Sequence, residues 1–337
     1  MRKLYVTIVC AGLVCAAACT ARKEEPKVQV DRTRLAAFKP LPLVMDAASN
    51  PLTEEKIALG RMLYYETRLS KGNDVSCNSC HNLNTFGADT GAVSDGFKGQ
   101  KGNRNSPTVY NAAGHIAQFW DGRAPTVEEQ AKGPVLNPVE MAMSAEKDVV
   151  ATLNGIPGYV KAFKQAFPED KDPVTFDNMA RAIGAFERKL VTPARWDKYL
   201  NGDDTALTDA EKAGLVKFLD TGCHACHSGA YMGGTMYQKL GLVKPWPDTE
   251  KDPGRFALTK SESDRMIFKV PSLRNIEKTG PYYHDGGVPT LKAAVEKMAE
   301  HQLGRTLSAE DSEAITAWLA SLTGELPVEY IKAPALP

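Results

Sequence analysis

The 337-residue sequence has no net charge and few cysteines. The first property argues against a nucleic-acid-binding protein, and the second against a disulfide-rich one. Lysine and arginine total 41 and aspartate and glutamate total 41, so no general positive field would attract nucleic acid. Three of the seven cysteines lie within the first 19 residues, and the other four stand in two close pairs, with none left over for a disulfide framework. The hydrophobic fraction of 43% is ordinary, and the length is sufficient for two domains with cores of their own.

The first 19 residues differ from the rest of the chain. A basic start and an apolar run end in three alanines before Cys19. This pattern predicts a secretory leader over residues 1–19 and a periplasmic protein. Cys19, followed by the charged stretch 22–27, resembles a bacterial lipoprotein junction, although alanine stands where leucine is usual three residues before it. A lipid anchor at Cys19 and a soluble periplasmic product both remain open.

Two stretches, 77–81 and 223–227, share the pattern Cys-x-x-Cys-His. Two thiols at this spacing can add across the vinyl groups of one haem, and the adjoining imidazole can then bind the iron. The pattern predicts two c-type haems, attached and ligated by Cys77, Cys80 and His81 in the first stretch and by Cys223, Cys226 and His227 in the second. A metal site and a thioredoxin-like dithiol are the alternatives, and the duplication disfavours both.

A weak internal repeat surrounds the two motifs. An amphipathic helix precedes each motif, with Thr53 as the N-cap of the first and a capping box of Thr208 and Glu211 in the second. Long loops and a later amphipathic helix follow each motif. We therefore predict an all-α fold of two cytochrome c-like domains, each with one covalently bound c-type haem and long irregular loops. The expected divisions are a leader over 1–19, a tether and lead-in over 20–50, an N-terminal haem domain over 51–200 and a C-terminal haem domain over 201–337.

The group on the far face of each iron decides between electron transfer and chemistry at the iron. The candidates are His115, His284, His301 and ten methionines, since His224 lies between the cysteines of its own motif. A methionine on a helical stripe, such as Met298, is usually a packing residue. Composition alone therefore leaves the choice open.

Six ordered runs of sequence extend beyond the haem motifs. They read RNSPTV, QFWDGR, EQAKGP, VEM, FKVPSLRN and YHDG, at residues 104–109, 118–123, 129–134, 139–141, 268–275 and 283–286. Through these runs the sequence resembles the bacterial dihaem cytochrome c peroxidases over about residues 50–325. The resemblance implies an oxidoreductase that reduces hydrogen peroxide, that is, a cytochrome-c peroxidase.

The resemblance assigns roles to individual residues. The haem on His81 is the low-potential peroxidatic one, and the haem on His227 is the high-potential one that receives electrons, with Met298 as its second ligand. The catalytic residues that it implies are Glu140 as the distal acid–base group, Gln130 as a second polar distal residue and Trp120 as the tryptophan between the haems. Without the resemblance, Glu140 would be interpreted as a surface charge.

The resemblance also implies a Ca²⁺ ion and protein partners. The ion would lie between the domains, held by the side chain of Asn105 and the backbone carbonyls of Thr279 and Pro281. The electron donor would be a small periplasmic cytochrome c or a cupredoxin, and the family is often homodimeric. Neither the charge nor the resemblance points to a nucleic-acid partner.

One departure from the family pattern concerns position 97. Many family members place a histidine sixteen residues after the proximal histidine of the first haem, where it blocks the iron until the other haem is reduced. Here that position, counted from His81, is Phe97, which cannot ligate iron. We therefore expect an enzyme whose first haem is open at rest and which needs no reductive activation.

Two functions from other classes remain as alternatives. A pure dihaem electron carrier would have two six-coordinate haems, and Glu140, Gln130 and Phe97 disfavour it. A relative of the maturation enzyme of methylamine dehydrogenase would oxidise side chains of another protein, but that relative carries a tyrosine at the position of Met298.

Overall fold

The structure, a computed structural model, describes residue 1 and residues 28–247 and 251–337. The expected leader and Cys19 lie outside the described residues. The fold is mostly helical, as the sequence predicts, and its sheet content is one antiparallel pair of short strands within the described part of the chain. The α-helices are α1 Glu54–Tyr64, α2 Cys77–Cys80, α3 Val127–Leu136, α4 Glu146–Asn154, α5 Pro157–Ala166, α6 Phe176–Glu187, α7 Arg195–Leu200, α8 Asp209–Thr221, α9 Phe256–Thr259, α10 Leu291–Leu303, α11 Ala309–Ala320 and α12 Val328–Ile331, and the strands are β1 Tyr237–Lys239 and β2 Ile267–Lys269.

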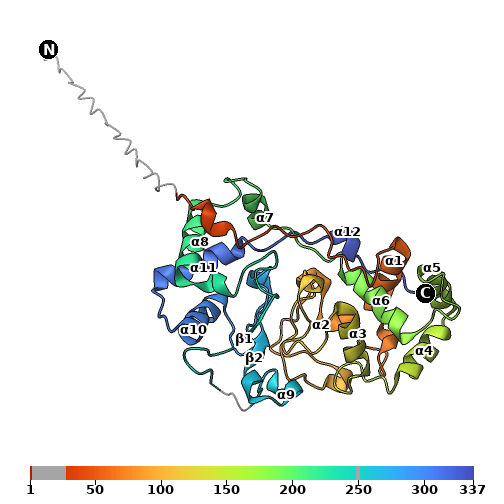
Figure 1. Ribbon diagram of the computed structural model, residues 1–337. Helices are drawn as coiled ribbons and strands as arrows, with labels where there is room; N and C mark the ends of the chain where they lie inside the picture. The colour runs from red at the N-terminus through yellow and green to blue at the C-terminus, as the bar shows by residue number, and fades with distance from the viewer. Residues whose placement is uncertain (2–27, 248–250) are drawn as a thin grey trace.

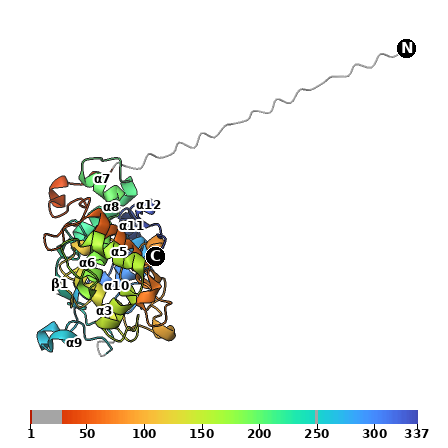
Figure 2. The same cartoon turned by 90° about the vertical axis from the view of Figure 1, so that its right-hand side faces the viewer.

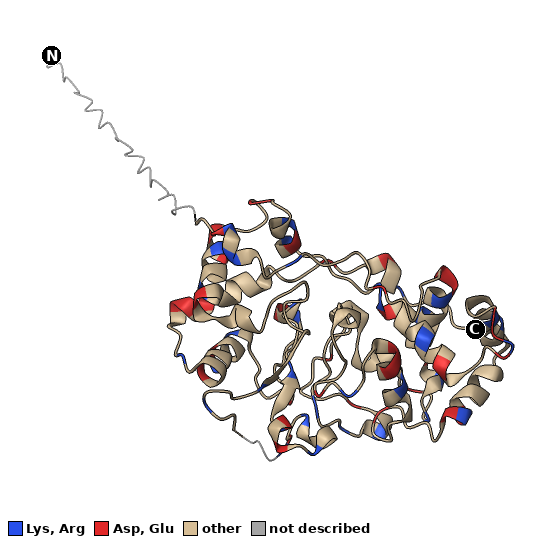
Figure 3. Cartoon of the chain, viewed as in Figure 1, with Lys and Arg blue, Asp and Glu red and all other residues tan. Residues whose placement is uncertain are grey.

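Two helical units lie end to end. Figure 1 shows α1 and α3 to α6 in one unit and α8, α10, α11 and the strands in the other, while the view turned by 90° in Figure 2 is much narrower. The two-domain cytochrome c-like architecture is confirmed. Acidic and basic segments alternate over both units (Figure 3), in keeping with the zero net charge.

Each unit is built on one close crossing of two helices. Gly60 of α1 meets α6 so tightly that an added Cβ would lie 1.9 Å from the carbonyl oxygen of Ala182. Gly214 of α8 meets α11 in the same way, with the Cβ position 1.9 Å from the carbonyl oxygen of Ala314. The internal repeat expected from sequence is therefore also a repeat of backbone packing, and only glycine fits at these two crossings.

The caps predicted from sequence are present. The Thr53 side chain accepts from the Lys56 N–H at the start of α1, and Thr208 and Glu211 form a reciprocal capping box at the start of α8. Gly222 ends α8 in the left-handed region with φ of 96°, directly before Cys223. The second haem motif therefore begins where α8 ends, whereas turns and a short 3₁₀ segment separate α1 from the first motif.

The two ends of the chain are exchanged between the units. Leu35 and Phe38 belong to the core of the second unit, and Ile331 belongs to the core of the first. Met45 then joins the first unit, where its N–H donates to the carbonyl oxygen of Arg188 at 2.9 Å. The described part of the expected lead-in is therefore a packed strap across both units, which sequence reasoning did not anticipate because the strap has no periodic pattern.

The long loops were anticipated. Between α2 and α3 the chain forms turns and short 3₁₀ segments without an α-helix. Residue 1 and the two described ranges contain no helix with the length and hydropathy needed to cross a membrane.

Candidate haem and peroxide site

The first Cys-x-x-Cys-His motif forms a single helical turn, α2. Ser76 and Ser79 close a capping box at its start, and His81 is its C-cap. The Tyr64 hydroxyl donates to the His81 carbonyl oxygen at 2.7 Å, which holds the backbone rather than the ring. The His81 Nδ1 atom is buried and has no hydrogen-bond partner, and burial lowers the pKa of this histidine. A neutral imidazole is the form that can bind iron.

The second motif opens onto a cavity of about 260 Å³. Cys223, Cys226 and His227 line it together with Met298 of α10, and most of its other walls are apolar. The His227 Nδ1–H donates to the Met232 carbonyl oxygen at 3.3 Å, which leaves the Nε2 lone pair free. Burial lowers the pKa of His227 to about 4, so the ring is neutral at pH 7.

The four described cysteines are free thiols. Burial raises the pKa of Cys77 to about 12 and that of Cys223 to about 11. A redox-active dithiol needs a lowered thiol pKa, so these values oppose the thioredoxin-like alternative. In the described part of the chain, no three His, Cys, Asp or Glu side chains are grouped to hold a metal ion.

Of the other candidate histidines, His115 and His284 line the cavity and His301 does not. His301 is buried with its Nδ1 atom 3.0 Å from the Lys244 carbonyl oxygen, and it does not line the cavity. His284 does line it, stacked on Phe268 with ring centroids 4.6 Å apart. His115 also lines this cavity.

Trp120 lies where the two units meet. Its indole N–H donates to the Asn105 carbonyl oxygen at 2.9 Å, and its own carbonyl oxygen accepts from the Lys269 N–H of β2 at 2.8 Å. The ring lines the cavity and approaches His284 edge-on at 6.5 Å. The tryptophan is thus fixed by both units at once.

Glu140 lies beside the first haem motif. Its carboxylate accepts from the Asn137 amide at 2.7 Å, and its charge helps burial to raise the pKa of both Cys77 and Cys80. Burial raises the pKa of Glu140 itself, against the opposing effects of the Asn137 hydrogen bond and the Arg123 charge. Gln130 is half-buried on the neighbouring helix α3.

The predicted calcium ligands share one neighbourhood. Asn105, Thr279 and Pro281 all line the large cavity. The Asn105 amide N–H donates to the carbonyl oxygens of Gly91 and Ala92 at 3.3 and 3.2 Å, an orientation that leaves its Oδ1 atom available. Amide and carbonyl oxygens are donors that suit Ca²⁺.

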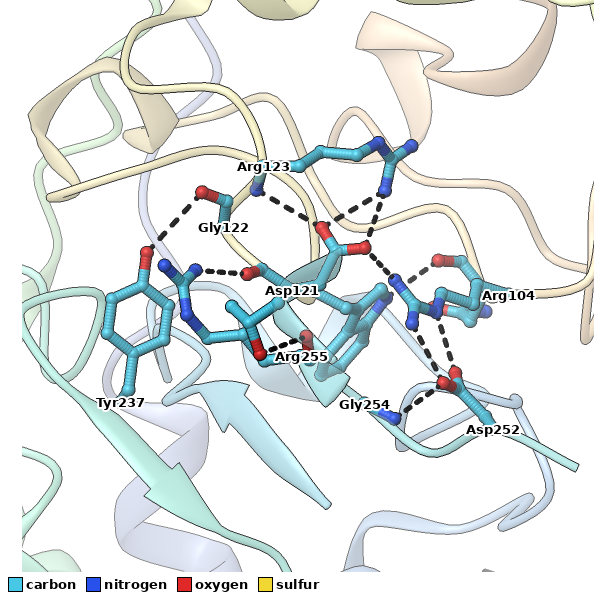
Figure 4. Close-up of polar contacts among 11 residues, drawn as sticks. Arg104, Asp121, Gly122, Arg123, Tyr237, Asp252, Gly254 and Arg255 are labelled. Carbon is cyan, nitrogen blue, oxygen red and sulfur yellow. Dashed lines mark hydrogen bonds and ion pairs between the residues drawn. The ribbon is translucent and has the colours of Figure 1, made fainter. Parts of the chain in front are cut away.

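A network of charges around Trp120 was missed by sequence reasoning. Arg104 pairs with Asp121 at 2.7 Å and binds Asp252 through two contacts at 2.6 and 2.8 Å (Figure 4). Arg123 contacts both carboxylate oxygens of Asp121 at 3.1 Å, and Arg255 donates to the Asp121 carbonyl oxygen at 2.7 Å. The network ties the Trp120 loop to the second unit. Its only sequence signal was that Arg104 and Asp121 adjoin Asn105 and Trp120.

Comparison with known proteins identifies the family of the chain. The family described as di-haem cytochrome c peroxidase matches residues 54–205. A cytochrome c551 peroxidase of Pseudomonas aeruginosa is 50% identical over 307 residues, which cover 89% of this chain and 88% of the relative. The chain belongs to the di-haem cytochrome c peroxidase family. A cytochrome c551 peroxidase of Nitrosomonas europaea is 46% identical over 293 residues, 86% of each chain.

A solved structure of similar fold agrees with this membership. The crystal structure of a MauG-like protein associated with microbial copper homeostasis has a TM-score of 0.78 and 29% identity, and the match covers 88% of this chain and 97% of that chain. As a di-haem cytochrome c peroxidase, the protein is an oxidoreductase with two c-type haems. The unpaired His81 ring and the cavity bounded by His227 and Met298 fit these two groups.

Proposed function

We propose that the protein reduces hydrogen peroxide to two waters, taking up two protons and two electrons from a small cytochrome c or cupredoxin. The observation that carries the proposal is the inequality of the two haem sites. One site presents His227 and Met298 in the lining of a mostly apolar cavity, and the other has the carboxylate of Glu140 beside it. The relatives named cytochrome c551 peroxidase support the same activity.

Haem iron, when bound, supplies the centre at which the O–O bond is cleaved and from which electrons are delivered. Glu140 would take a proton from one peroxide oxygen and give it to the other, which leaves as water. The Asn137 amide holds one oxygen of this carboxylate, which fixes the direction of proton transfer. Gln130 stabilises the departing oxygen as a hydrogen-bond donor.

Electrons enter at the second unit and pass the contact between the units. With His227 and Met298 as the residues that would hold it, the second haem would have a raised potential, because a thioether ligand favours ferrous iron. Trp120 lies on the way to the first unit, joined to β2 through its backbone and to Asn105 through its indole N–H.

Phe97 cannot ligate iron, so a haem held by His81 would need no reductive activation. Phe97 stands at the position of the blocking histidine, and its loop is tied to the Glu140 segment by main-chain hydrogen bonds. The test is steady-state peroxide reduction by fully oxidised and by half-reduced enzyme. Equal initial rates support the proposal, and a rate that rises only after half-reduction contradicts it.

The proposal also covers the domain bounds, the calcium site, the cellular location and the oligomeric state. The chain divides into haem domains at residues 51–200 and 201–337, close to the change of core between Leu190 of the first unit and Ala194 of the second. A Ca²⁺ ion is held by Asn105, Thr279 and Pro281. The protein is periplasmic, either soluble or anchored by lipid on Cys19, and forms a homodimer.

One alternative has an observation in its favour. The similarity to a MauG-like structure allows oxidation of another protein's side chains. Met298 opposes it, since the maturation enzyme of methylamine dehydrogenase carries tyrosine at that position. Absence of the long-wavelength absorption band of methionine-ligated haem would favour the alternative.

A further inference from the structure

The buried side chain of Lys269 lines the cavity near His227 and Met298 and has no counter-ion among the described residues. Lys269 of β2 is 8% exposed and lines the same cavity as His227 and Met298. Its Nζ donates to the Ala117 carbonyl oxygen at 2.8 Å and lies 3.3 Å from the His115 Nδ1 atom. Both contacts are to neutral groups, and within the described part of the chain no carboxylate forms an ion pair with it.

Comparable buried cations are paired. Arg188 binds the Glu128 carboxylate through two contacts at 2.8 and 2.9 Å, and Arg274 binds Asp197 through two at 2.7 and 2.9 Å. A buried charge without its partner is strongly unfavourable. Burial lowers the pKa of Lys269 to about 8, with the Asp121 charge acting against it, so the ammonium is still mainly charged at pH 7. The cavity therefore needs an anion.

Two hydrogen bonds orient the Lys269 ammonium, and one of its N–H groups remains without a partner among the described residues. It has three N–H groups, of which one donates to Ala117 and one to the His115 ring. Since His115 accepts at Nδ1, its ring proton is on Nε2, which is buried without a partner. The third N–H of Lys269 is free for a ligand in the cavity.

We propose that Lys269 binds a propionate carboxylate of the second haem, with His115 and the Ala117 carbonyl as the groups that position its ammonium. This inference rests on the proposal that this haem is bound between His227 and Met298. A haem brings two carboxylates into a cavity that is otherwise mostly apolar, and one of them supplies the missing counter-ion.

The placement of Lys269 agrees with the chemistry of a c-type haem. Such a haem is attached through its vinyl edge, and its propionates extend from another edge of the ring. Cys223 packs against the core of the second unit, whereas the Lys269 N–H donates to the Trp120 carbonyl oxygen at 2.8 Å. β2 lies on the side of the second unit that faces the first (Figure 1). A propionate bound by Lys269 would therefore lie on the side of the cavity that adjoins Trp120.

This ion pair has a consequence for electron transfer. A fixed positive charge near the haem stabilises the reduced iron more than the oxidised iron, because oxidation adds a positive charge. Lys269 therefore helps Met298 to raise the potential of the electron-accepting haem, from a position adjoining Trp120.

The test compares Lys269→Met with Lys269→Arg in the holoprotein. Resonance Raman spectra report the propionate bending vibration, and redox titration reports the midpoint potential of the second haem. Lys269→Met is expected to shift the propionate band and lower the potential, whereas Lys269→Arg keeps the potential near that of the unaltered protein. His115→Phe removes one positioning contact and is expected to shift the band in the same direction by less.

The matched control is Lys56→Met. Lys56 is equally buried at 8% exposure, donates to the Pro51 carbonyl oxygen and lies in the first unit, so this change should leave both readouts unaltered. An unchanged propionate band and potential in fully haem-loaded Lys269→Met overturns the inference. If that variant does not load haem, the Lys269→Arg spectrum decides, since a two-pronged guanidinium contact must move the band of a bonded propionate. Absence of two haems from the unaltered protein would instead refute the proposed function.

Discussion

Phe97 and Glu140 are joined through their main chains, because the Phe97 N–H donates to the Glu140 carbonyl oxygen at 2.7 Å and to that of Val139 at 3.1 Å. Gly96 lies so close that an added Cβ would be 2.0 Å from the Val139 carbonyl oxygen. The loop that carries the blocking ligand in many relatives is thus attached to the segment that carries the acid–base group. We predict that the side chain at position 97 determines whether a haem bound at His81 is blocked.

Phe97→His should restore the block. The backbone contacts do not involve the side chain, so the new imidazole can take the position of the relatives' ligand. We expect a bis-histidine low-spin signal in the resting electron paramagnetic resonance spectrum and a loss of at least about tenfold in peroxide reduction by the oxidised enzyme, about 1.4 kcal/mol of barrier. Phe97→Leu should keep the open state. A bis-histidine signal for the first haem of the unaltered protein would refute the expectation.

Glu140→Gln should remove acid–base catalysis while keeping the hydrogen-bonding shape. We expect kcat/KM for peroxide to fall by roughly 10²–10⁴-fold. Glu129→Gln on the exposed side of α3 is the control, since Glu129 pairs with Lys132 at the surface. A variant at position 140 as active as the control would exclude Glu140 from the chemistry.

The pH dependence of peroxide reduction should reflect the ionisation of Glu140. The carboxyl must be ionised to accept a proton, and burial raises its pKa, so activity is lost as the pH falls through a value above the ordinary glutamate range. Asn137→Ala removes a hydrogen bond that lowers this pKa, and the acid limb should move to higher pH. Steady-state rates from pH 4 to pH 8 would show the shift. An unmoved acid limb would mean that another group titrates there.

Met298→Leu should convert the second haem from an electron acceptor to a low-potential centre. Cys223 and Cys226 still attach the haem, but the loss of the thioether removes the preference for ferrous iron. The methionine absorption band should disappear and the potential should fall, as followed by spectroelectrochemistry. Met62→Leu, on helix α1 of the first unit, should change neither property.

Gly214→Ala should destabilise the second unit. The added methyl group would meet the Ala314 carbonyl oxygen at 1.9 Å, which forces α8 and α11 apart at a cost of about 1–3 kcal/mol. Gly133→Ala in α3 is the control, because its nearest neighbour would lie at 3.5 Å, an ordinary contact. The melting temperature of Gly214→Ala should fall, whereas that of Gly133→Ala should rise or stay unchanged. An equal fall in both variants would refute the close-crossing interpretation.

Much of this protein could be predicted from local pattern. A Cys-x-x-Cys-His turn needs only five consecutive residues to place two thiols and an imidazole at one haem, and the caps at Thr53 and Thr208 act within one helical turn. The all-α, two-domain fold followed from the duplication of such signals. The assignment of Met298, Glu140, Gln130 and Trp120 depended instead on the resemblance to a family.

Tertiary structure alone decided which residues meet across long separations. Lys269 and His115 stand 154 positions apart and contact one another only because β2 returns to the Trp120 loop. The exchange of chain ends could not be predicted from periodicity, since Leu35, Phe38 and Ile331 lie in segments without a helical or strand pattern and are buried by residues far away in sequence. Helix caps and haem attachment are satisfied by neighbours in sequence, whereas counter-ions and core contacts are chosen by the packing of the whole chain.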